Sequence, residues 1–368
     1  MQEEESFPDV YTKQIPYKPG PKPGQLTKEQ LHLFYTEGFV VIEDFFEKDL
    51  LEKAKESIGN LSNDIIGDLF DAGKLSSCYE DETLFTRMTK VNQEFPGASI
   101  LFHKRGVLPE ALQAIWSYPK LLHIVEQLVG PNIIGHTVWN LRVKLPHNEA
   151  EVVPWHQDNG YLQESSLGTM MPTAWIPLLD TDAANGGMEL VRGTQRHGVT
   201  GEHHCCAGAT WYIEMEEEEI VKKFEANMKT DSIICNVPFG GLLLFSNALI
   251  HRSLPNTSDK IRWSLDFRWQ DPDKPTGRPE ENAKFPLMMK NGKIVENVDF
   301  SGVQGRHGSH QKNDVKDASG NNYMEDAFDT RIAGPWMKRW TIKHHNKHTA
   351  LGQEQLAGDG KIIGWHSP

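Results

Sequence analysis

The sequence predicts an α+β, mainly β fold, in which a jelly roll of two facing β-sheets carries flanking helices. Two observations support this prediction. The hydrophobic pattern takes a period of two near residue 133, and the chain stays rich in strand patterns to about residue 269. In the first and last of these strands polar and apolar residues alternate, so each strand has one polar and one apolar face. Two such strands are expected where the polar faces line a solvated cavity between two sheets.

Local patterns predict the individual elements. Thr27 and Gln30 form a capping-box pattern that opens a helix to about Glu37, and Gly38 ends it. Further helices are expected at residues 49–58 and 109–129, the second interrupted at Tyr118-Pro119. The expected strands cover residues 39–42, 133–145, 174–179, 187–191, 231–237, 242–250 and 262–269.

Composition divides the chain into three parts. Residues 1–26 contain five prolines among polar residues, which predicts an extended N-terminal arm. Residues 27–271 hold the predicted helices and strands and form the main domain. Residues 272–368 are poor in strand patterns, with a turn expected at 290–293. We expect this C-terminal extension to pack on the same domain, to act as a lid, or to form an oligomer contact.

The charge balance and hydropathy exclude some classes of partner. The 368 residues have a formal net charge of -13, whereas nucleic-acid binding needs clustered Lys and Arg. No window approaches the roughly 18 consecutive apolar residues of a membrane span. The first residues are acidic, unlike a signal or transit peptide. We therefore expect a cytoplasmic protein that acts on a small molecule; the sequence gives no indication of its oligomeric state.

The cysteine spacing and the last residues of the sequence indicate a cellular compartment. Cys78, Cys205, Cys206 and Cys235 show no CxxC spacing, and two of them are adjacent. This arrangement favours free thiols in a reducing compartment. The last residues, at 365–368, do not match a Ser-Lys-Leu type peroxisomal signal, so the peroxisome is the less favoured location.

A candidate metal site lies in Trp155-His156-Gln157-Asp158. On an extended strand His156 and Asp158 point to the same face, and His251, after the expected strand at 242–250, can supply a third ligand from a facing strand. Two His and one carboxylate leave three positions of a metal open, which suits Fe(II) oxygenase chemistry. With 16 His in the chain, an HxD pair alone is weak evidence.

Arg262 adds specificity to this pattern. It lies eleven residues after His251 on the polar face of the next expected strand. A guanidinium there can pair bidentately with a carboxylate such as that of 2-oxoglutarate.

From Leu26 to Trp269 the chain resembles the phytanoyl-CoA hydroxylase (phytanoyl-CoA dioxygenase) family of Fe(II)/2-oxoglutarate oxygenases. The motifs that carry the resemblance appear in order: Leu26-Thr27-Lys28-Glu29-Gln30, Gly38-Phe39-Val40-Val41-Ile42, Thr89-Lys90-Val91, Gly130-Pro131-Asn132-Ile133, Trp155-His156-Gln157-Asp158, Asn185-Gly186-Gly187-Met188-Glu189-Leu190, His251-Arg252-Ser253-Leu254-Pro255-Asn256 and Arg262. The chain departs from the family after residue 191, where Arg192-Gly193-Thr194-Gln195 replaces Pro-Gly-Ser-His.

The resemblance implies a double-stranded β-helix of the cupin-like kind and an oxygenase mechanism. Iron(II) is the expected metal, 2-oxoglutarate and O2 the expected cosubstrates, and ascorbate an expected stimulant. The implied reaction hydroxylates an unactivated C–H bond of a small organic substrate and releases succinate and CO2. Asp158, in place of Gly or Ala, disfavours the halogenating branch of this chemistry.

The resemblance also assigns residues. It implies three iron ligands, His156, Asp158 and His251. The implied contacts of the cosubstrate are Arg262, Ser253, Lys90 and Trp175, with Asn140 chosen over Trp139 by its inward parity. Substrate contacts are expected at Arg142, Trp155, Tyr161 and Asn247, for each of which packing or a surface salt bridge is the simpler alternative.

Two other functions would also fit the triad, and two other histidine groups occur in the sequence. A catalytically silent metal-binding jelly roll, or a cupin-like isomerase or hydrolase with another divalent metal, would carry a similar triad. The group His344, His345 and His348 lacks a carboxylate or Cys and has flanking Lys residues, so we do not expect a metal there. Residues 203–206 read as a loop or strand edge, because adjacent ligands rarely converge on one ion.

Overall fold

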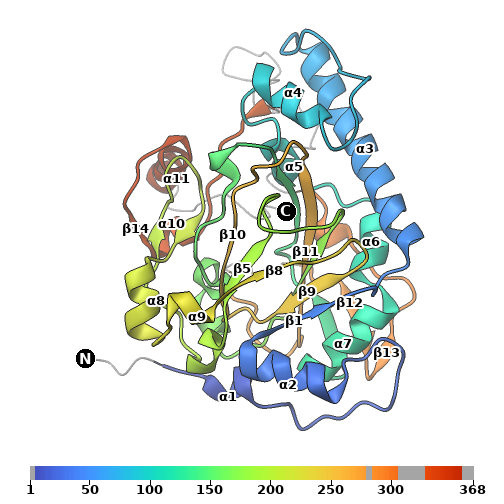
Figure 1. The fold of residues 1–368 in the computed structure, drawn as a ribbon, viewed down its shortest axis with the longest axis vertical. Helices are drawn as coiled ribbons and strands as arrows, with labels where there is room; N and C mark the ends of the chain where they lie inside the picture. The colour runs from blue at the N-terminus through green and yellow to red at the C-terminus, as the bar shows by residue number, and fades with distance from the viewer. Residues whose placement is uncertain (1–4, 279–283, 306–327, 359–368) are drawn as a thin grey trace.

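The computed structural model describes residues 5–278, 284–305 and 328–358, with the side chains of the last helix described as far as residue 354. Figure 1 shows a β-sheet core with long helices on one side and a group of C-terminal elements on the other. No helix among the described residues is long and apolar enough to cross a membrane.

The strands of the described residues form three sheets. The main sheet has eight strands in the order β1 (Phe39–Ile42), β9 (Leu242–Phe245), β4 (Thr173–Pro177), β11 (Arg262–Gln270), β2 (Ile133–Gly135), β12 (Leu287–Lys290) and β13 (Lys293–Ile294), with β3 (Asn140–Lys144) also paired to β11. The second sheet has the order β10 (Ile250–Ser253), β5 (Met188–Val191) and β8 (Ser232–Cys235). The third has the order β14 (Thr341–Ile342), β6 (His204–Cys205) and β7 (Ile213–Glu214).

The fold is the predicted α+β double-stranded β-helix with flanking helices. The helices are α1 (Pro8–Thr12), α2 (Lys28–Glu37), α3 (Lys48–Asp71), α4 (Arg87–Glu94), α5 (Ile100–Arg105), α6 (Glu110–Trp116), α7 (Pro119–Val129), α8 (Glu217–Lys223), α9 (Met228–Asp231), α10 (Trp336–Arg339) and α11 (Lys347–Gly358). Short 3-10 turns lie between them, and one of these, Asp158–Tyr161, belongs to the site.

Strand β11 divides the interior from the outer core. Its odd-numbered residues, from Trp263 to Trp269, are buried in the main hydrophobic cluster together with residues of α3, α6 and α7. Its even-numbered residues are polar, as the alternation predicted. Since successive side chains of a strand point to opposite faces, the helices cover one face of the main sheet and the polar face is left for the interior.

The predicted helix start and stop at α2 are confirmed. Thr27 Oγ1 accepts from the Gln30 amide, and the Gln30 side chain accepts from the Thr27 amide, which completes the capping box. Gly38 follows in the left-handed region with φ 90°. The backbone conformation therefore favours glycine, and a side chain there would also displace the ends of the Gln195 and Leu249 side chains.

Two expected long strands are each split in the structure. Residues 242–250 form β9, a turn closed by Leu249 N donating to Ser246 O, and then β10. The turn carries the chain from the main sheet to the second sheet, so the prediction of one strand ending at Ile250 is wrong. Residues 133–145 likewise form β2 and β3, which pair with different parts of β11. Apolar runs hide such breaks because both pieces are buried.

The N-terminal arm is not wholly extended. Helix α1 lies within it, and the Tyr11 side chain is completely buried. The prediction of free thiols is wrong for Cys205 and Cys206, which form a vicinal disulfide in the structure. It is confirmed for Cys78 and Cys235, which are free.

The part of the C-terminal extension that is described pairs with strands of the rest of the chain in two places. Strands β12 and β13 form a hairpin on the main sheet, and its turn residues Asn291 and Gly292 have φ of 51° and 73°. The turn expected at 290–293 is thus confirmed, with the left-handed pair typical of a two-residue hairpin loop. Strand β14 pairs in parallel with β6.

Candidate metal centre and cosubstrate pocket

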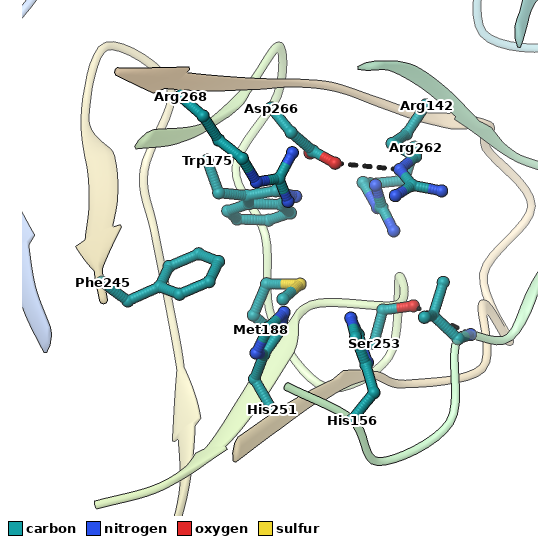
Figure 2. Close-up of a pocket in the computed structure, with 11 residues that line it drawn as sticks. Arg142, His156, Trp175, Met188, Phe245, His251, Ser253, Arg262, Asp266 and Arg268 are labelled. Atoms are coloured by element: carbon teal, nitrogen blue, oxygen red, sulfur yellow. Dashed lines mark hydrogen bonds and ion pairs between the residues drawn. The ribbon is translucent and has the colours of Figure 1, made fainter. Parts of the chain in front are cut away.

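A pocket opens between the main and second sheets. It encloses about 390 Å³ of non-atom space, part of it continuous with solvent, and strands β3, β4, β5, β10 and β11 contribute to its lining. Figure 2 shows His156 and His251 side by side at one wall, with Arg268 opposite and with Arg142 and Arg262 together near Ser253. Three arginines in one pocket indicate an anionic occupant or buried carboxylate partners.

The three predicted ligands converge at this pocket. The ligand atoms of His156, Asp158 and His251 all lie within 4.8 Å of one another, and all three residues are buried. Asp158 Oδ1 is 3.9 Å from Nε2 of each histidine. His156 and His251 face each other across an antiparallel β-bridge, whereas Asp158 begins a 3-10 turn rather than continuing the strand.

Backbone hydrogen bonds orient both imidazoles. Nδ1 of His156 lies 2.9 Å from Pro154 O, and Nδ1 of His251 lies 2.9 Å from Leu249 O. A carbonyl oxygen can only accept, so Nδ1 carries the proton and Nε2 presents its lone pair to the shared space. Burial lowers the pKa of both histidines, and for His156 the nearby His251 lowers it further. Both rings are therefore neutral near pH 7, as metal ligation requires.

Asp158 is held ionised by an arginine that lies far away in the sequence. Arg268 Nε and Nη2 donate to Asp158 Oδ2 and Oδ1, each at 2.9 Å, and Thr173 Oγ1 donates to Oδ2 at 3.0 Å. Burial opposes ionisation of Asp158, but the Arg268 guanidinium outweighs it and keeps the pKa of Asp158 below its usual range. The donor set is thus two neutral imidazoles and one carboxylate, which fits a divalent iron.

Arg262 lies in the same pocket and forms no ion pair with an acidic side chain of the described residues. Its side chain is buried, its Nη1 donates to Ser264 Oγ at 2.6 Å, and its Nε has no hydrogen-bond partner. Its guanidinium carbon is 5.4 Å from the centre of the Trp175 ring. Burial lowers the pKa of Arg262 to about 10, which leaves it charged at neutral pH. A buried guanidinium with an unused donor indicates a missing anionic partner.

Arg142 and Asp266 form a separate ion pair on the polar faces of β3 and β11. Arg142 Nε donates to Asp266 Oδ2 at 2.9 Å, and Arg142 Nη1 donates to the Tyr212 hydroxyl at 3.2 Å. Asn140 Nδ2 also donates to Asp266 Oδ2, at 3.2 Å. Arg142 and Arg268 are therefore neutralised by carboxylates, and Arg262 is the lining arginine that has no ion pair with a described residue.

Comparison with known proteins assigns the chain to a family. The family model for phytanoyl-CoA dioxygenase (PhyH) matches residues 34–264, more than half of the chain. The chain belongs to the phytanoyl-CoA dioxygenase family. This is a family of Fe(II)/2-oxoglutarate-dependent oxygenases.

Curated relatives of this family match over part of their length. The chain is 28% identical over 170 residues to 1-deoxypentalenic acid 11-beta-hydroxylase of Streptomyces exfoliatus, covering 42% of this chain and 56% of the relative. It is 28% identical over 182 residues to phytanoyl-CoA dioxygenase domain-containing protein 1 of Danio rerio, covering 46% and 58%. It is 24% identical over 267 residues to phytanoyl-CoA dioxygenase of Arabidopsis thaliana, covering 65% and 87%. The first two matches thus span little more than half of those relatives.

Solved structures give more distant similarities. EctD from S. alaskensis with 2-oxoglutarate and 5-hydroxyectoine has a TM-score of 0.49 and 14% identity, covering 82% of this chain and 90% of that one. EctD with bound Fe has a TM-score of 0.49 and 17% identity, covering 76% and 88%.

The phytanoyl-CoA dioxygenase resemblance assigned two further residues that line the pocket, Ser253 and Trp175. Lys90, assigned in the same way, lies exposed on α4 and does not line the pocket. Asn140 is buried beside the pocket and reaches it through Asp266. A short motif such as Thr89-Lys90-Val91 does not fix which face of a helix a side chain occupies, because that depends on packing.

The four expected substrate contacts differ in position. Arg142 lines the pocket, and the Tyr161 ring lies edge-on to His156 at 5.6 Å. Trp155 faces away from the pocket, with the Arg252 guanidinium 4.4 Å from its ring. Asn247 is fully buried and hydrogen-bonded to Asn159, Thr169 and Met171, so its role is to hold loops together.

Arg268 and Asp266 also belong to the site, although the sequence patterns did not predict a role for either residue. Both lie on the polar face of β11, two and three alternate positions after Arg262. The signal was therefore the same alternation that selected Arg262. What the sequence lacked was their pairing with Asp158 and Arg142, which depends on long-range contacts.

The remaining histidines differ in their surroundings, and one of them, His344, lies beside a carboxylate. His344 lies near His204 and Glu214 within 4.8 Å, but His204 Nε2 already hydrogen-bonds Glu214 at 3.1 Å. His345 is exposed, and His348 is buried with Nδ1 accepting from Ile332 N at 2.8 Å. Residues 204–205 form strand β6, the middle strand of the third sheet, whereas residues 203 and 206 on either side of it are loop.

Proposed function

We propose that this protein is an Fe(II)- and 2-oxoglutarate-dependent dioxygenase that hydroxylates an unactivated C–H bond of a small organic substrate, with release of succinate and CO2. The observation that carries the proposal is the meeting, in one buried pocket, of the triad of His156, Asp158 and His251 with the unpaired Arg262. Neither half would suffice: the triad alone would fit other metals, and a lone arginine would fit many anions.

In this proposal the triad holds iron on one side and leaves the pocket side open. Iron bound there would supply O2 activation and a C–H-oxidising centre. The chain's contribution is geometric: backbone carbonyls fix the two imidazoles, and Arg268 fixes the carboxylate. Such outer partners typically raise metal affinity about 10- to 100-fold.

Arg262 and Ser253 are the proposed site for the distal carboxylate of 2-oxoglutarate. The unpartnered Nε of Arg262 and the Ser253 hydroxyl both lie at the pocket, on β11 and β10 respectively. Trp175 forms a wall beside Arg262 and excludes water from the ion pair. An ionised carboxylate there would satisfy the donor that the folded chain leaves unused.

The curated relatives support hydroxylation of a small molecule, since one of them is a 1-deoxypentalenic acid 11-beta-hydroxylase. The substrate of the present protein would bind in the same pocket, whose remaining lining includes Arg142, Met188 and Phe245. The enclosed space suits a small organic molecule rather than a polymer.

The test is anaerobic addition of Fe(II) and 2-oxoglutarate, read as the weak visible band of the chelate, followed by succinate formation on admitting O2. Arg262→Ala should raise the 2-oxoglutarate concentration needed for half-maximal succinate formation about 10- to 100-fold. Iron binding should stay nearly intact, because only a charged hydrogen-bonding partner of the cosubstrate is lost. Arg252→Ala is the matched control, since Arg252 lies on β10 but pairs with Glu189 on the outside at 2.7 Å. Iron bound in the site with no band and no succinate would disprove the oxygenase proposal and leave a silent metal-binding protein.

A further inference from the structure

The turn that carries Asp158 is held by a segment outside the matched family region. Helix α10 and the first residue after it, Trp340, lie about seventy residues beyond β11 and outside the family match at 34–264. Figure 1 shows α10, β14 and α11 grouped on the side of the molecule opposite α3 and α6. The segment therefore approaches the site from the face that the long helices leave uncovered.

Arg339 and Trp340 hydrogen-bond to the backbone of the turn directly after Asp158. Arg339 Nη1 donates to Asn159 O at 2.9 Å and also to Leu162 O. Trp340 Nε1 donates to Gly160 O at 2.7 Å. Asn159 O also accepts from Leu162 N within the turn, whereas the carbonyls at the end of a short helical turn generally lack internal partners, and a cation placed there also offsets their negative charge.

Ring contacts also link the C-terminal segment to His156, a second predicted ligand. Trp336 lies edge-on to Tyr161 at 5.3 Å, and Tyr161 lies edge-on to His156 at 5.6 Å. The Trp340 ring is 5.0 Å from His203, whose Nε2 accepts from the Gln157 amide at 3.1 Å. Gln157 stands between the two ligands in the chain, so the C-terminal segment is linked to the ligand stretch through Tyr161 and His203.

The turn at residues 158–161 is only weakly stabilised by its own backbone hydrogen bonds. Within it, Gly160 N donates to Gln157 O at 2.9 Å and Leu162 N donates to Asn159 O at 3.2 Å. A 3-10 turn of this length has poor hydrogen-bond geometry and no propagation to stabilise it. Donors from outside must therefore contribute much of its rigidity.

We propose that Arg339 and Trp340 are positioning residues of the candidate metal centre, which fix the turn at 158–161 and thereby the orientation of the Asp158 carboxylate. The proposal rests on the proposed function, because it assumes that Asp158 binds a metal. It assigns to the C-terminal segment a part in the site rather than a covering role. Asp158 is the ligand affected, because it is the first residue of the turn.

The test uses the full-length protein and Co(II) as an anaerobic spectroscopic probe of the triad. Arg339→Ala should bind Co(II) about 10- to 100-fold more weakly, as is typical when an outer partner of a ligand is lost. Trp340→Phe keeps the ring against His203 and removes one donor, so it should give a smaller loss. Lys343→Ala is the matched control, because Lys343 follows β14 but its ammonium pairs with the exposed Glu216 at 2.9 Å. It should bind Co(II) like the wild type.

A second readout separates positioning from general folding and needs no metal. Hydrogen exchange of the amides of Gly160 and Leu162 should be faster in Arg339→Ala and Trp340→Phe, with the exchange of β11 unchanged. Unchanged Co(II) affinity in both variants would overturn the proposal, whatever happens to exchange. If the wild type itself bound no Co(II) through His251, the proposed function would fail and the positioning role would fail with it. The wild-type titration separates this result from the first one, because unchanged affinity in both variants refutes the positioning role only where the wild type binds Co(II).

Discussion

The histidine side and the carboxylate side of the triad are held in different ways. His156 and His251 exchange two backbone hydrogen bonds of 3.0 Å across their β-bridge, and each Nδ1 binds a carbonyl two residues earlier in the chain. Asp158 instead depends on side chains, chiefly Arg268 and Thr173, and on a turn held from outside. The backbone thus fixes the histidines, whereas distant residues set the position of the carboxylate.

This difference has a functional meaning. A backbone-held ligand tolerates substitution of its neighbours, because the β-bridge persists whatever their side chains are. A ligand held by side chains can be adjusted by single substitutions far away in the sequence. We therefore expect the carboxylate side to be where metal affinity varies, and the following predictions test that contrast.

The largest effect is expected on the histidine side when a ligand itself is removed. His251→Ala should lose metal binding and lower succinate formation by roughly 10³-fold or more, because no neighbouring side chain replaces an imidazole held by backbone. Metal content and uncoupled 2-oxoglutarate turnover measure this, with Arg252→Ala as the neighbouring control. Retained turnover would remove His251 from the triad.

On the carboxylate side, Arg268→Leu should destabilise the metal-free protein by about 3–5 kcal/mol, because it leaves the buried Asp158 charge without its partner. A divalent metal should recover part of this loss, since it would neutralise the same carboxylate. Urea unfolding with and without Co(II) measures both effects.

The control for that variant is Arg192→Ala, which removes a half-exposed arginine 3.6 Å from Asp231. A surface pair of this kind is worth about 1 kcal/mol or less. An equal loss in the two variants would contradict the role given to Arg268.

Acid should weaken the fold through buried neutral histidines outside the triad. Burial lowers the pKa of His136, His203 and His348 to about 3 in each case. The unfolded chain binds protons at these positions below about pH 6.5 and the folded chain does not, so stability is lost as the pH falls. Each should cost about 1.4 kcal/mol per pH unit below that value.

Urea midpoints between about pH 7.5 and 5 measure this slope. His203→Gln, beside the C-terminal segment, should reduce the slope by the contribution of one proton. A stability that stayed constant over that range would show that these histidines are protonated in the folded state.

The smallest effect is expected at the N-terminal support of the turn. The Tyr11 hydroxyl donates to Leu167 O at 2.6 Å and accepts from Asn159 Nδ2 at 3.3 Å. Tyr11→Phe should cost about 1 kcal/mol and change Co(II) affinity less than Arg339→Ala. The reason is that Asn247 still holds Asn159 through a side-chain bond of 2.7 Å. A larger affinity loss than in Arg339→Ala would place the main support at the N-terminal end.

Local sequence patterns predicted much of the fold. The capping box at Thr27, the hairpin turn at Asn291-Gly292 and the alternation of β11 are decided within a few residues, and the structure has each of them. The break between β9 and β10 was missed, because a buried apolar run carries no sign of a change of sheet.

The sequence predicted which residues meet in the site, but not which residues hold them in position. His156, Asp158, His251 and Arg262 stand in a recognisable order, and the structure brings them to one pocket. The parity argument assumed that Asp158 continues a strand, whereas it begins a turn. The residues that hold that turn come from positions 11, 247 and 339–340, and no periodicity links such distant parts of a chain.

Strand β11 also limits how the chain can change in length. It places Arg262, Asp266 and Arg268 on one face, with about 3.3 Å of strand per residue between them. Inserting one residue after Ser264 would leave Arg262 in the pocket but turn Asp266 and Arg268 into the apolar layer beneath the helices. Inserting two would restore the face and shift Arg268 by roughly 7 Å away from Asp158. The strand thus sets the distance between the anion site and the metal ligands, and an insertion within it would disrupt one or the other.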